Sequence, residues 1–146
     1  MKKILPFILS FLVLQSAYAL EQNYPAACPS VGALASVGVN DTGLFTKDFW
    51  IVKMKQHDYG TPQLWSFSFF GNMKTSEEAV LAVANASIHQ LVLKGGPVDF
   101  NENGSEWGCL YDYNGADGSI SGLAITPPKK MPAHMADIKN YIANHS

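Results

Sequence analysis

The chain contains no arginine, and all ten of its basic residues are lysines. Arginine carries the planar fork of N–H donors that binds phosphates and the edges of guanine, so its absence argues against a nucleic-acid-binding protein. The lysines are also spread along the chain, without the basic block that draws a protein to an anionic membrane surface. We therefore expect no nucleic acid among the partners.

Long apolar runs are also few. The longest spans residues 4–14, which is shorter than the about 20 residues that a membrane-spanning helix needs. It follows Lys2 and Lys3 and precedes residues 17–19 (Ala-Tyr-Ala), a small-residue pattern at which signal peptidase cleaves. Residues 1–19 are therefore predicted to be a signal peptide. The mature protein is expected to be periplasmic or secreted, with no integral membrane span.

Only two cysteines occur, Cys28 and Cys109. Because an exported protein folds in an oxidising compartment, they are predicted to form one disulfide bond, in preference to a catalytic thiol or a metal-binding pair. Removal of the first 19 of the 146 residues leaves 127, the size of one domain, residues 20–146. Eight lysines against twelve acidic residues make this domain mildly acidic.

The spacing of apolar residues predicts both helices and strands in the first half of the chain. Residues 31–37 suit a short helix capped by Ser30. Residues 49–55 and 64–70 alternate apolar and polar positions. We expect these two strands to pair as an antiparallel hairpin.

The strongest helical pattern runs from about residue 76 to residue 94. Thr75 and Glu78 have the spacing of a capping box, and the glycines and proline of residues 95–97 should end the helix. Its apolar side should pack on the aromatic face of the hairpin. The residues on that side are Val80, Val83, Ala84, Ser87, Ile88 and Leu91.

Two more strands and a last helix complete the expected fold. Residues 107–113 and 119–126 alternate and are separated by turn-forming Asn-Gly and Asp-Gly pairs. Residues 133–143 have amphipathic helical spacing, with Met135, Ile138, Tyr141 and Ile142 on the apolar side. The class is therefore α+β: an antiparallel sheet of about four or five strands, one long helix packed on a face, and short terminal helices.

No strong catalytic motif is present. The segment 118–122 (Gly-Ser-Ile-Ser-Gly) has isoleucine where a nucleophile elbow needs serine. Residues 99–104 match only the first half of a calcium loop, because Leu110 stands where the bidentate glutamate should be. We expect a protein that is not an enzyme, and a plain polar loop in preference to a calcium site.

One loop places a possible iron ligand among large aromatic residues. His57 and Tyr59 lie in the predicted turn, and Trp50 and Trp65 lie on the adjoining strands. An imidazole beside aromatic side chains can ligate and stack an iron porphyrin. These four residues are the candidate cofactor-binding site, with heme as the cofactor and Tyr59 as the alternative iron ligand. The edge of an aromatic core has the same composition, so a structural role stays open.

Several short motifs resemble a family of small exported bacterial proteins, some of which are named hemin-binding protein. They include residues 27–31 (Ala-Cys-Pro-Ser-Val), 107–111 (Trp-Gly-Cys-Leu-Tyr) and 126–128 (Thr-Pro-Pro). The likeness covers about residues 27–128. It implies hemin as the ligand and the same disulfide bond as above, but it supplies no set of iron ligands.

The leading hypothesis is a small exported ligand-binding protein whose ligand is hemin, taken up for iron acquisition, or another small apolar molecule. The alternative is an exported envelope or host-interaction protein, non-enzymatic, that contacts a protein partner through an aromatic surface. A third is an envelope hydrolase. A pocket beside a histidine or tyrosine favours hemin, a flat aromatic patch favours a partner, and a histidine bonded to an acid in a cleft favours catalysis.

Overall fold

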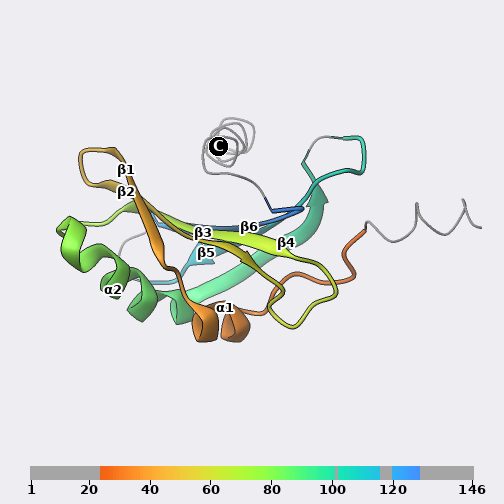
Figure 1. Cartoon of the computed structure of the whole chain (residues 1–146), viewed down its shortest axis with the longest axis horizontal. Coiled ribbons are helices and arrows are strands. Elements are labelled where there is room, and N and C mark those ends of the chain that lie inside the picture. Colours follow the sequence, from red (N-terminus) through yellow and green to blue (C-terminus); the bar gives the residue numbers. More distant parts are fainter. Residues whose placement is uncertain (1–23, 101, 116–119, 129–146) are drawn as a thin grey trace, which may run out of the picture.

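The protein is built on a six-stranded antiparallel sheet, with the strand order β1-β2-β3-β6-β5-β4. The computed structural model describes residues 24–100, 102–115 and 120–128. Two helices lie on the same side of the sheet (Figure 1). The strands are β1 (Asp41–Thr46), β2 (Phe49–His57), β3 (Trp65–Asn72), β4 (Leu91–Asp99), β5 (Trp107–Tyr113) and β6 (Ser121–Thr126).

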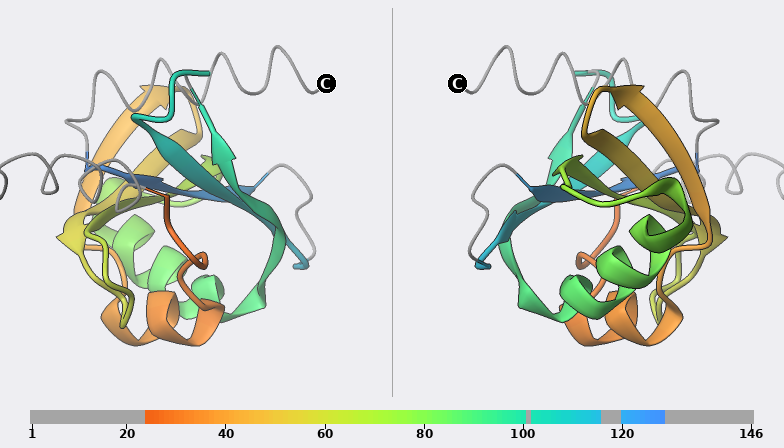
Figure 2. Two further views of the ribbon diagram at one scale, coloured as in Figure 1. Left: turned by 90° about the vertical axis from the view of Figure 1, so that its right-hand side faces the viewer. Right: turned by 90° about the vertical axis from the view of Figure 1, so that its left-hand side faces the viewer.

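The helices are short. Helix α1 (Val31–Val37) begins at Ser30, whose side chain accepts a hydrogen bond from the Ala33 N–H, as predicted. Helix α2 (Glu77–Ser87) continues into the 3₁₀ turn η2 (Ile88–Gln90). The sheet curves around both helices, so the helices occupy its concave side (Figure 2). The α+β class is therefore confirmed.

The two hairpins expected from alternation are present. Strands β2 and β3 pair in antiparallel register, with Ile51 opposite Phe70. Strands β5 and β6 pair likewise, with Cys109 opposite Ala124. Alternation predicts strands of this kind well, because a residue period of two places every second side chain in a buried face.

The long helix was predicted to extend too far. Helix α2 has 11 residues and its N-cap is Ser76. No side-chain hydrogen bond caps this helix, so the prediction of a capping box at Thr75 and Glu78 is wrong. The chain leaves the helix after Ser87, and Leu91 opens a strand. Leucine and valine at positions 91–93 are compatible with an edge strand as well as with a helix. They form a strand because they pair with β5.

Two strands were missed, which is why the sheet has six strands where four or five were expected. Both lie at the edges of the sheet. Strand β1 is short and only half apolar, so it lacks a clear alternating signal. Strand β4 contains Gly95, Gly96 and Pro97, which read as a helix stop. An edge strand tolerates proline because one of its sides makes no ladder hydrogen bonds.

The core between the helices and the concave face is largely aromatic. Val80, Ala84 and Ile88 of the helical segment pack in one buried cluster with Phe67 and Phe69 of β3. The expected contact between helix and hairpin is therefore confirmed for these residues. Val83 is the exception, since it is 40% exposed and does not belong to the buried side.

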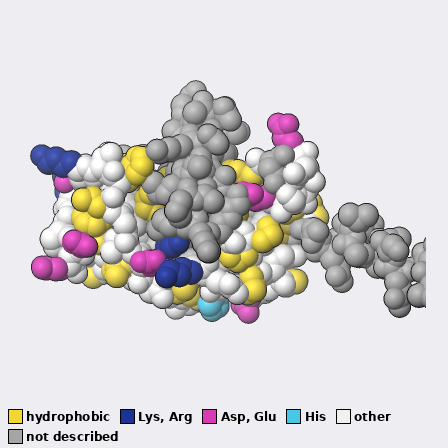
Figure 3. Space-filling view, turned by 45° about the horizontal axis from the view of Figure 1, so that its top comes forward, with side chains coloured by type: hydrophobic (Ala, Val, Ile, Leu, Met, Phe, Trp, Pro, Cys, Tyr) yellow, Lys and Arg dark blue, Asp and Glu magenta, His cyan; other side chains and the backbone are white. Residues whose placement is uncertain are grey.

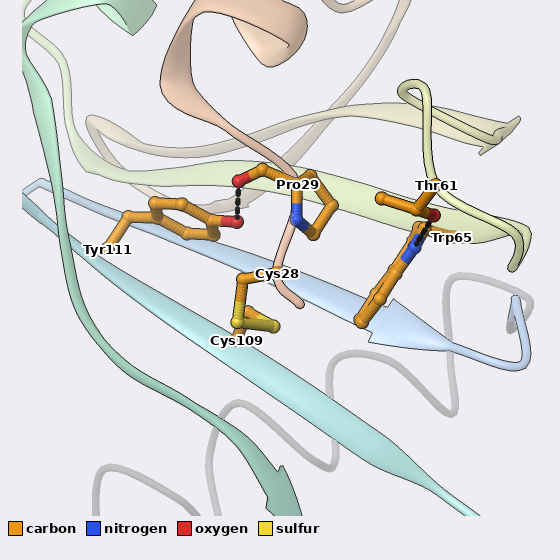
Figure 4. The surroundings of a disulfide bond; sticks show 6 residues. All are labelled: Cys28, Pro29, Thr61, Trp65, Cys109 and Tyr111. Atoms are coloured by element: carbon orange, nitrogen blue, oxygen red, sulfur yellow. Dashed lines mark hydrogen bonds between the residues drawn. A yellow bond between two sulfur atoms is a disulfide. The ribbon is translucent and has the colours of Figure 1, made fainter. Parts of the chain in front are cut away.

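The disulfide bond between Cys28 and Cys109 is confirmed. It joins the residues that precede α1 to the middle of β5, and its two Cα atoms are 5.8 Å apart. Beside it the Tyr111 hydroxyl donates a hydrogen bond of 2.7 Å to the Pro29 carbonyl (Figure 4). A covalent bond and a buried hydrogen bond thus hold this segment on the sheet.

Two predicted segments, the signal peptide at residues 1–19 and the helix at residues 133–143, lie outside the described residues. Within residues 24–100, 102–115 and 120–128, no helix reaches the length and apolar character of a membrane span.

A pair of substitutions tests the packing of α2. Val80 is fully buried and Val83 is 40% exposed, and both lie in the same helix. Val80→Ala should lower the free energy of unfolding by about 2 kcal/mol, because it removes buried methyl groups and leaves a cavity. Val83→Ala should change it by less than about 0.5 kcal/mol. Urea unfolding measures both values, and equal losses would contradict this packing.

A second pair of substitutions tests the disulfide bond. The bridge closes a sequence separation of 81 residues. The chain-entropy model gives a loop of this size about 4 to 5 kcal/mol of stabilisation. In the double variant Cys28→Ala, Cys109→Ala, the free energy of unfolding in urea should therefore be about 4 to 5 kcal/mol lower than in the oxidised protein. A difference under about 1 kcal/mol would show that the bridge constrains little.

Candidate functional site

The loop between β2 and β3 is held by its own polar groups. The Asp58 carboxylate accepts a hydrogen bond from the Gly60 N–H at 2.9 Å, and the Asp58 carbonyl accepts one from the Thr61 N–H at 2.9 Å. The Thr61 hydroxyl accepts a hydrogen bond of 2.8 Å from the indole N–H of Trp65 (Figure 4). These contacts tie the loop to the buried start of β3.

His57 ends β2 at the base of this loop, and its side chain is 42% exposed. Its Nδ1 atom accepts a hydrogen bond of 2.9 Å from the backbone N–H of Tyr59. The two rings lie against each other with centroids 4.9 Å apart. Tyr59 has φ of 52°, a left-handed conformation that turns its N–H back toward the imidazole. The local backbone therefore fixes the orientation of the ring.

This hydrogen bond decides which chemistry His57 offers. A backbone N–H can only donate, so Nδ1 must be the unprotonated nitrogen, and the neutral ring carries its proton on Nε2. The exposed imidazole therefore presents an N–H donor. To ligate iron through Nε2, the ring would have to move its proton to Nδ1 and lose the contact with Tyr59.

The aromatic members of the predicted site lie in the core. Trp50, Tyr59 and Trp65 are all buried. Tyr59 and Trp65 lie next to His57, whereas Trp50 is seven residues away along β2, or about 23 Å at the rise of a strand. The structure thus brings together His57, Tyr59 and Trp65 and separates Trp50 from them. The two indoles present no open face on which a porphyrin could stack.

Three exposed or half-buried apolar residues lie near His57 at the same end of the sheet. Leu64 is 46% exposed, and its carbonyl accepts a hydrogen bond from Thr126 at the end of β6. Thr126 is paired with Trp107 at the start of β5. Tyr24 is 56% exposed and packs edge-on against Trp107, with ring centroids 4.5 Å apart. We call His57, Leu64, Trp107 and Tyr24 the sheet-end cluster.

The sheet-end cluster spans the ends of four adjacent strands. From β2, which carries His57, it crosses β3 and β6 to reach Trp107 on β5. Three strand spacings correspond to about 14 Å. Tyr24 joins the cluster because the disulfide bond holds the nearby Cys28 on β5. Sequence reasoning missed Tyr24, Leu64 and Trp107, because no local pattern links residues so far apart in the chain.

Two residues at this end of the sheet have a buried donor without a hydrogen-bond partner in the described part of the chain. The donors are the Tyr59 hydroxyl and the indole N–H of Trp107. Buried polar groups almost always have a partner, which can be an ordered water or a ligand.

The half-matched calcium loop satisfies its own backbone. The Asp99 carboxylate accepts a hydrogen bond of 2.7 Å from the Gly104 N–H, and the Asn103 amide oxygen accepts one of 3.0 Å from the Ser105 N–H. These two hydrogen bonds close the turn. Within the described ranges, no three His, Cys, Asp or Glu side chains are grouped as a metal site would require.

No protein-family model, curated protein or solved structure matches the chain. The resemblance to a family of small exported bacterial proteins, some of which are named hemin-binding protein, therefore rests on the short sequence motifs alone.

Burial also changes the acidity of two tyrosines beside the site. Desolvation raises the pKa of Tyr59 well above its ordinary value. The pKa of Tyr111 is raised by desolvation and, to a lesser extent, by the nearby Tyr59. Both phenols therefore stay neutral in the folded protein at pH values where an unfolded chain ionises them.

This shift predicts a loss of stability in alkali. Below about pH 10 the stabilisation by the neutral phenols is fully present, and it decreases as the pH rises further because only the unfolded state ionises. The free energy of unfolding should fall by about 1.4 kcal/mol per pH unit for each of the two groups. Urea unfolding at several pH values measures this slope, and Tyr59→Phe should reduce it. Phenolate absorbance from both tyrosines in the folded protein would contradict the prediction.

Proposed function

We propose that this protein is a small exported binding protein, without catalytic activity, whose ligand is hemin and whose binding surface is the sheet-end cluster. The observation that carries the proposal is the position of His57. Its half-exposed imidazole has a fixed orientation and lies at the same end of the sheet as the exposed side chains of Leu64 and Tyr24. The resemblance of the sequence to exported hemin-binding proteins supports hemin as the ligand.

The chemistry of the cluster suits a flat, apolar molecule with acidic groups. Leu64, Trp107 and Tyr24 offer apolar contact across the ends of β3, β6 and β5, or about 10 Å at the spacing of strands. The Nε2–H of His57 can donate to a carboxylate, and hemin carries carboxylates on the rim of its ring. In this arrangement His57 contacts a propionate group of hemin. Iron ligation through the same nitrogen requires the proton shift described above.

Titration of the oxidised mature protein with hemin tests the proposal. A saturable shift of the Soret band is expected. Leu64→Ser should weaken hemin binding by about tenfold, because the apolar contact of a leucine side chain is lost. Val92→Ser is the matched control, since Val92 is 53% exposed and lies on β4, toward the opposite end of the sheet. Equal effects of the two substitutions, or no saturable binding, would contradict the proposed site.

A second titration separates the two roles of His57. His57→Ala should weaken hemin binding in either role, and His89→Ala, at an exposed histidine in η2, should leave it unchanged. If His57 donates to a propionate, the shape of the Soret band of the bound hemin stays the same in His57→Ala. A changed band would identify His57 as an iron ligand. Unchanged affinity in His57→Ala would remove this loop from the site.

The β1–β2 hairpin favours a second function, contact with a protein partner. At its turn Leu44 is 59% exposed, and Phe45 packs edge-on against Phe49 with centroids 5.7 Å apart. The space-filling view shows hydrophobic side chains in several separate groups over the described surface (Figure 3). A photo-crosslinking residue at position 45 should then give one discrete adduct in living cells, and the same residue at position 92 should not. No adduct at position 45 would exclude this function for the hairpin.

A further inference from the structure

The loop between β4 and β5 contains an exposed asparagine, Asn103, that is followed by Gly104. An asparagine loses its side-chain amide when the backbone nitrogen of the next residue attacks the side-chain carbon. This attack is easiest before glycine, which has no side chain to hinder it. The chain has a second pair of this kind, Asn114 and Gly115. The surroundings of the two pairs differ.

The attacking nitrogen of the first pair is held by a carboxylate. The Gly104 N–H donates a hydrogen bond of 2.7 Å to Oδ2 of Asp99, the last residue of β4. A carboxylate in this position can take the proton while the nitrogen forms a bond to carbon. Gly104 has φ of 71°, and no described atom other than those of its chain neighbours lies within 4 Å of the place where a Cβ would be. The backbone therefore has room to approach the Asn103 side chain.

The carbonyl group that receives the attack is held as well. Oδ1 of Asn103 accepts a hydrogen bond of 3.0 Å from the Ser105 N–H. This bond keeps the side chain folded back over its own backbone. The same N–H faces the oxygen on which negative charge develops when a nucleophile adds to the carbon. The loop thus supplies both a general base and an oxyanion donor.

We propose that Asn103 is a site of self-modification, at which Asp99 acts as the base and the Ser105 N–H stabilises the oxyanion. The Gly104 nitrogen forms a bond to Cγ of Asn103 while its proton passes to the Asp99 carboxylate, and the carbonyl electrons move to Oδ1. The bond from Cγ to the amide nitrogen then breaks, and this nitrogen takes the proton from Asp99 and leaves as ammonia. Water opens the cyclic imide at one of its two carbonyls, which leaves aspartate or isoaspartate at position 103.

The reaction adds a negative charge to a loop that is already acidic. Residues 99–107 contain Asp99, Glu102 and Glu106, and no lysine or histidine. Glu102 is exposed and Glu106 is buried. Neither the reaction nor its product requires a bound ligand, so this inference is separate from the proposed function.

The second asparagine provides an internal control in the same molecule. Asn114 is also exposed, but its side chain makes no hydrogen bond with another described residue, and the ring of Tyr113 lies over Gly115. The oxidised mature protein is incubated at neutral pH, and loss of each amide is followed by peptide mapping with mass spectrometry. The loss at position 103 should be at least about tenfold faster than at position 114. A smaller ratio would overturn the proposal.

The dependence of the two rates on pH distinguishes a base from a merely favourable loop shape. At Asn114 hydroxide must remove the proton, so the rate should rise about tenfold per pH unit. At Asn103 a carboxylate removes it, and carboxylates are ionised throughout the neutral range, so the rate should stay nearly constant between about pH 6 and pH 8. The same rise at both positions would overturn the proposal.

Matched substitutions each remove one carboxylate from the loop. Asp99→Asn keeps an oxygen that can accept a hydrogen bond from the Gly104 N–H but cannot take its proton. The loss of the amide at position 103 should therefore become slower by at least about tenfold. Glu102→Gln removes an exposed carboxylate that does not take part in this hydrogen bond, and it should leave the rate unchanged. Equal rates in the two variants would overturn the proposal.

Discussion

The disulfide bond between Cys28 and Cys109 links the two parts of the molecule that its site needs. It attaches the residues before α1 to β5 across 81 positions of sequence, and the hydrogen bond from Tyr111 to Pro29 lies beside it. Helix α1 follows within a few residues, so its place under the sheet depends on the same attachment. Tyr24 reaches Trp107 for the same reason. Without this bond, the sheet end would lose one side of its aromatic surface.

The aromatic residues divide between core and surface in a way that shapes the proposed function. Trp50, Tyr59 and Trp65 are used to fill the concave side of the sheet. What remains accessible is one edge of His57, held by Tyr59, and the apolar side chains at the strand ends. This surface is therefore suited to bind a ligand by apolar contact and hydrogen bonding, and not by stacking it between two indoles.

Local patterns in the sequence were enough for the central strands, the helix cap and the disulfide bond. The β2–β3 hairpin was predicted from alternation, the cap at Ser30 from capping chemistry, and the disulfide bond from the two cysteines in a chain expected to be exported. The edge strands β1 and β4 were not predictable, because pairing with a neighbour, and not their own composition, makes them strands. The burial of Trp50 and Trp65 and the approach of Tyr24 to Trp107 depend on long-range packing, which no local window contains.

The disulfide bond builds the sheet end by holding Tyr24 against Trp107. The most direct measurement is the set of nuclear Overhauser contacts between these two rings, in the oxidised mature protein and in the variant Cys28→Ala, Cys109→Ala. Strong contacts between Tyr24 and Trp107 are expected in the oxidised protein, and they should be lost in the variant, while contacts between Phe67 and Tyr111 in the core persist. Equal contacts between Tyr24 and Trp107 in both proteins would contradict this role of the disulfide bond.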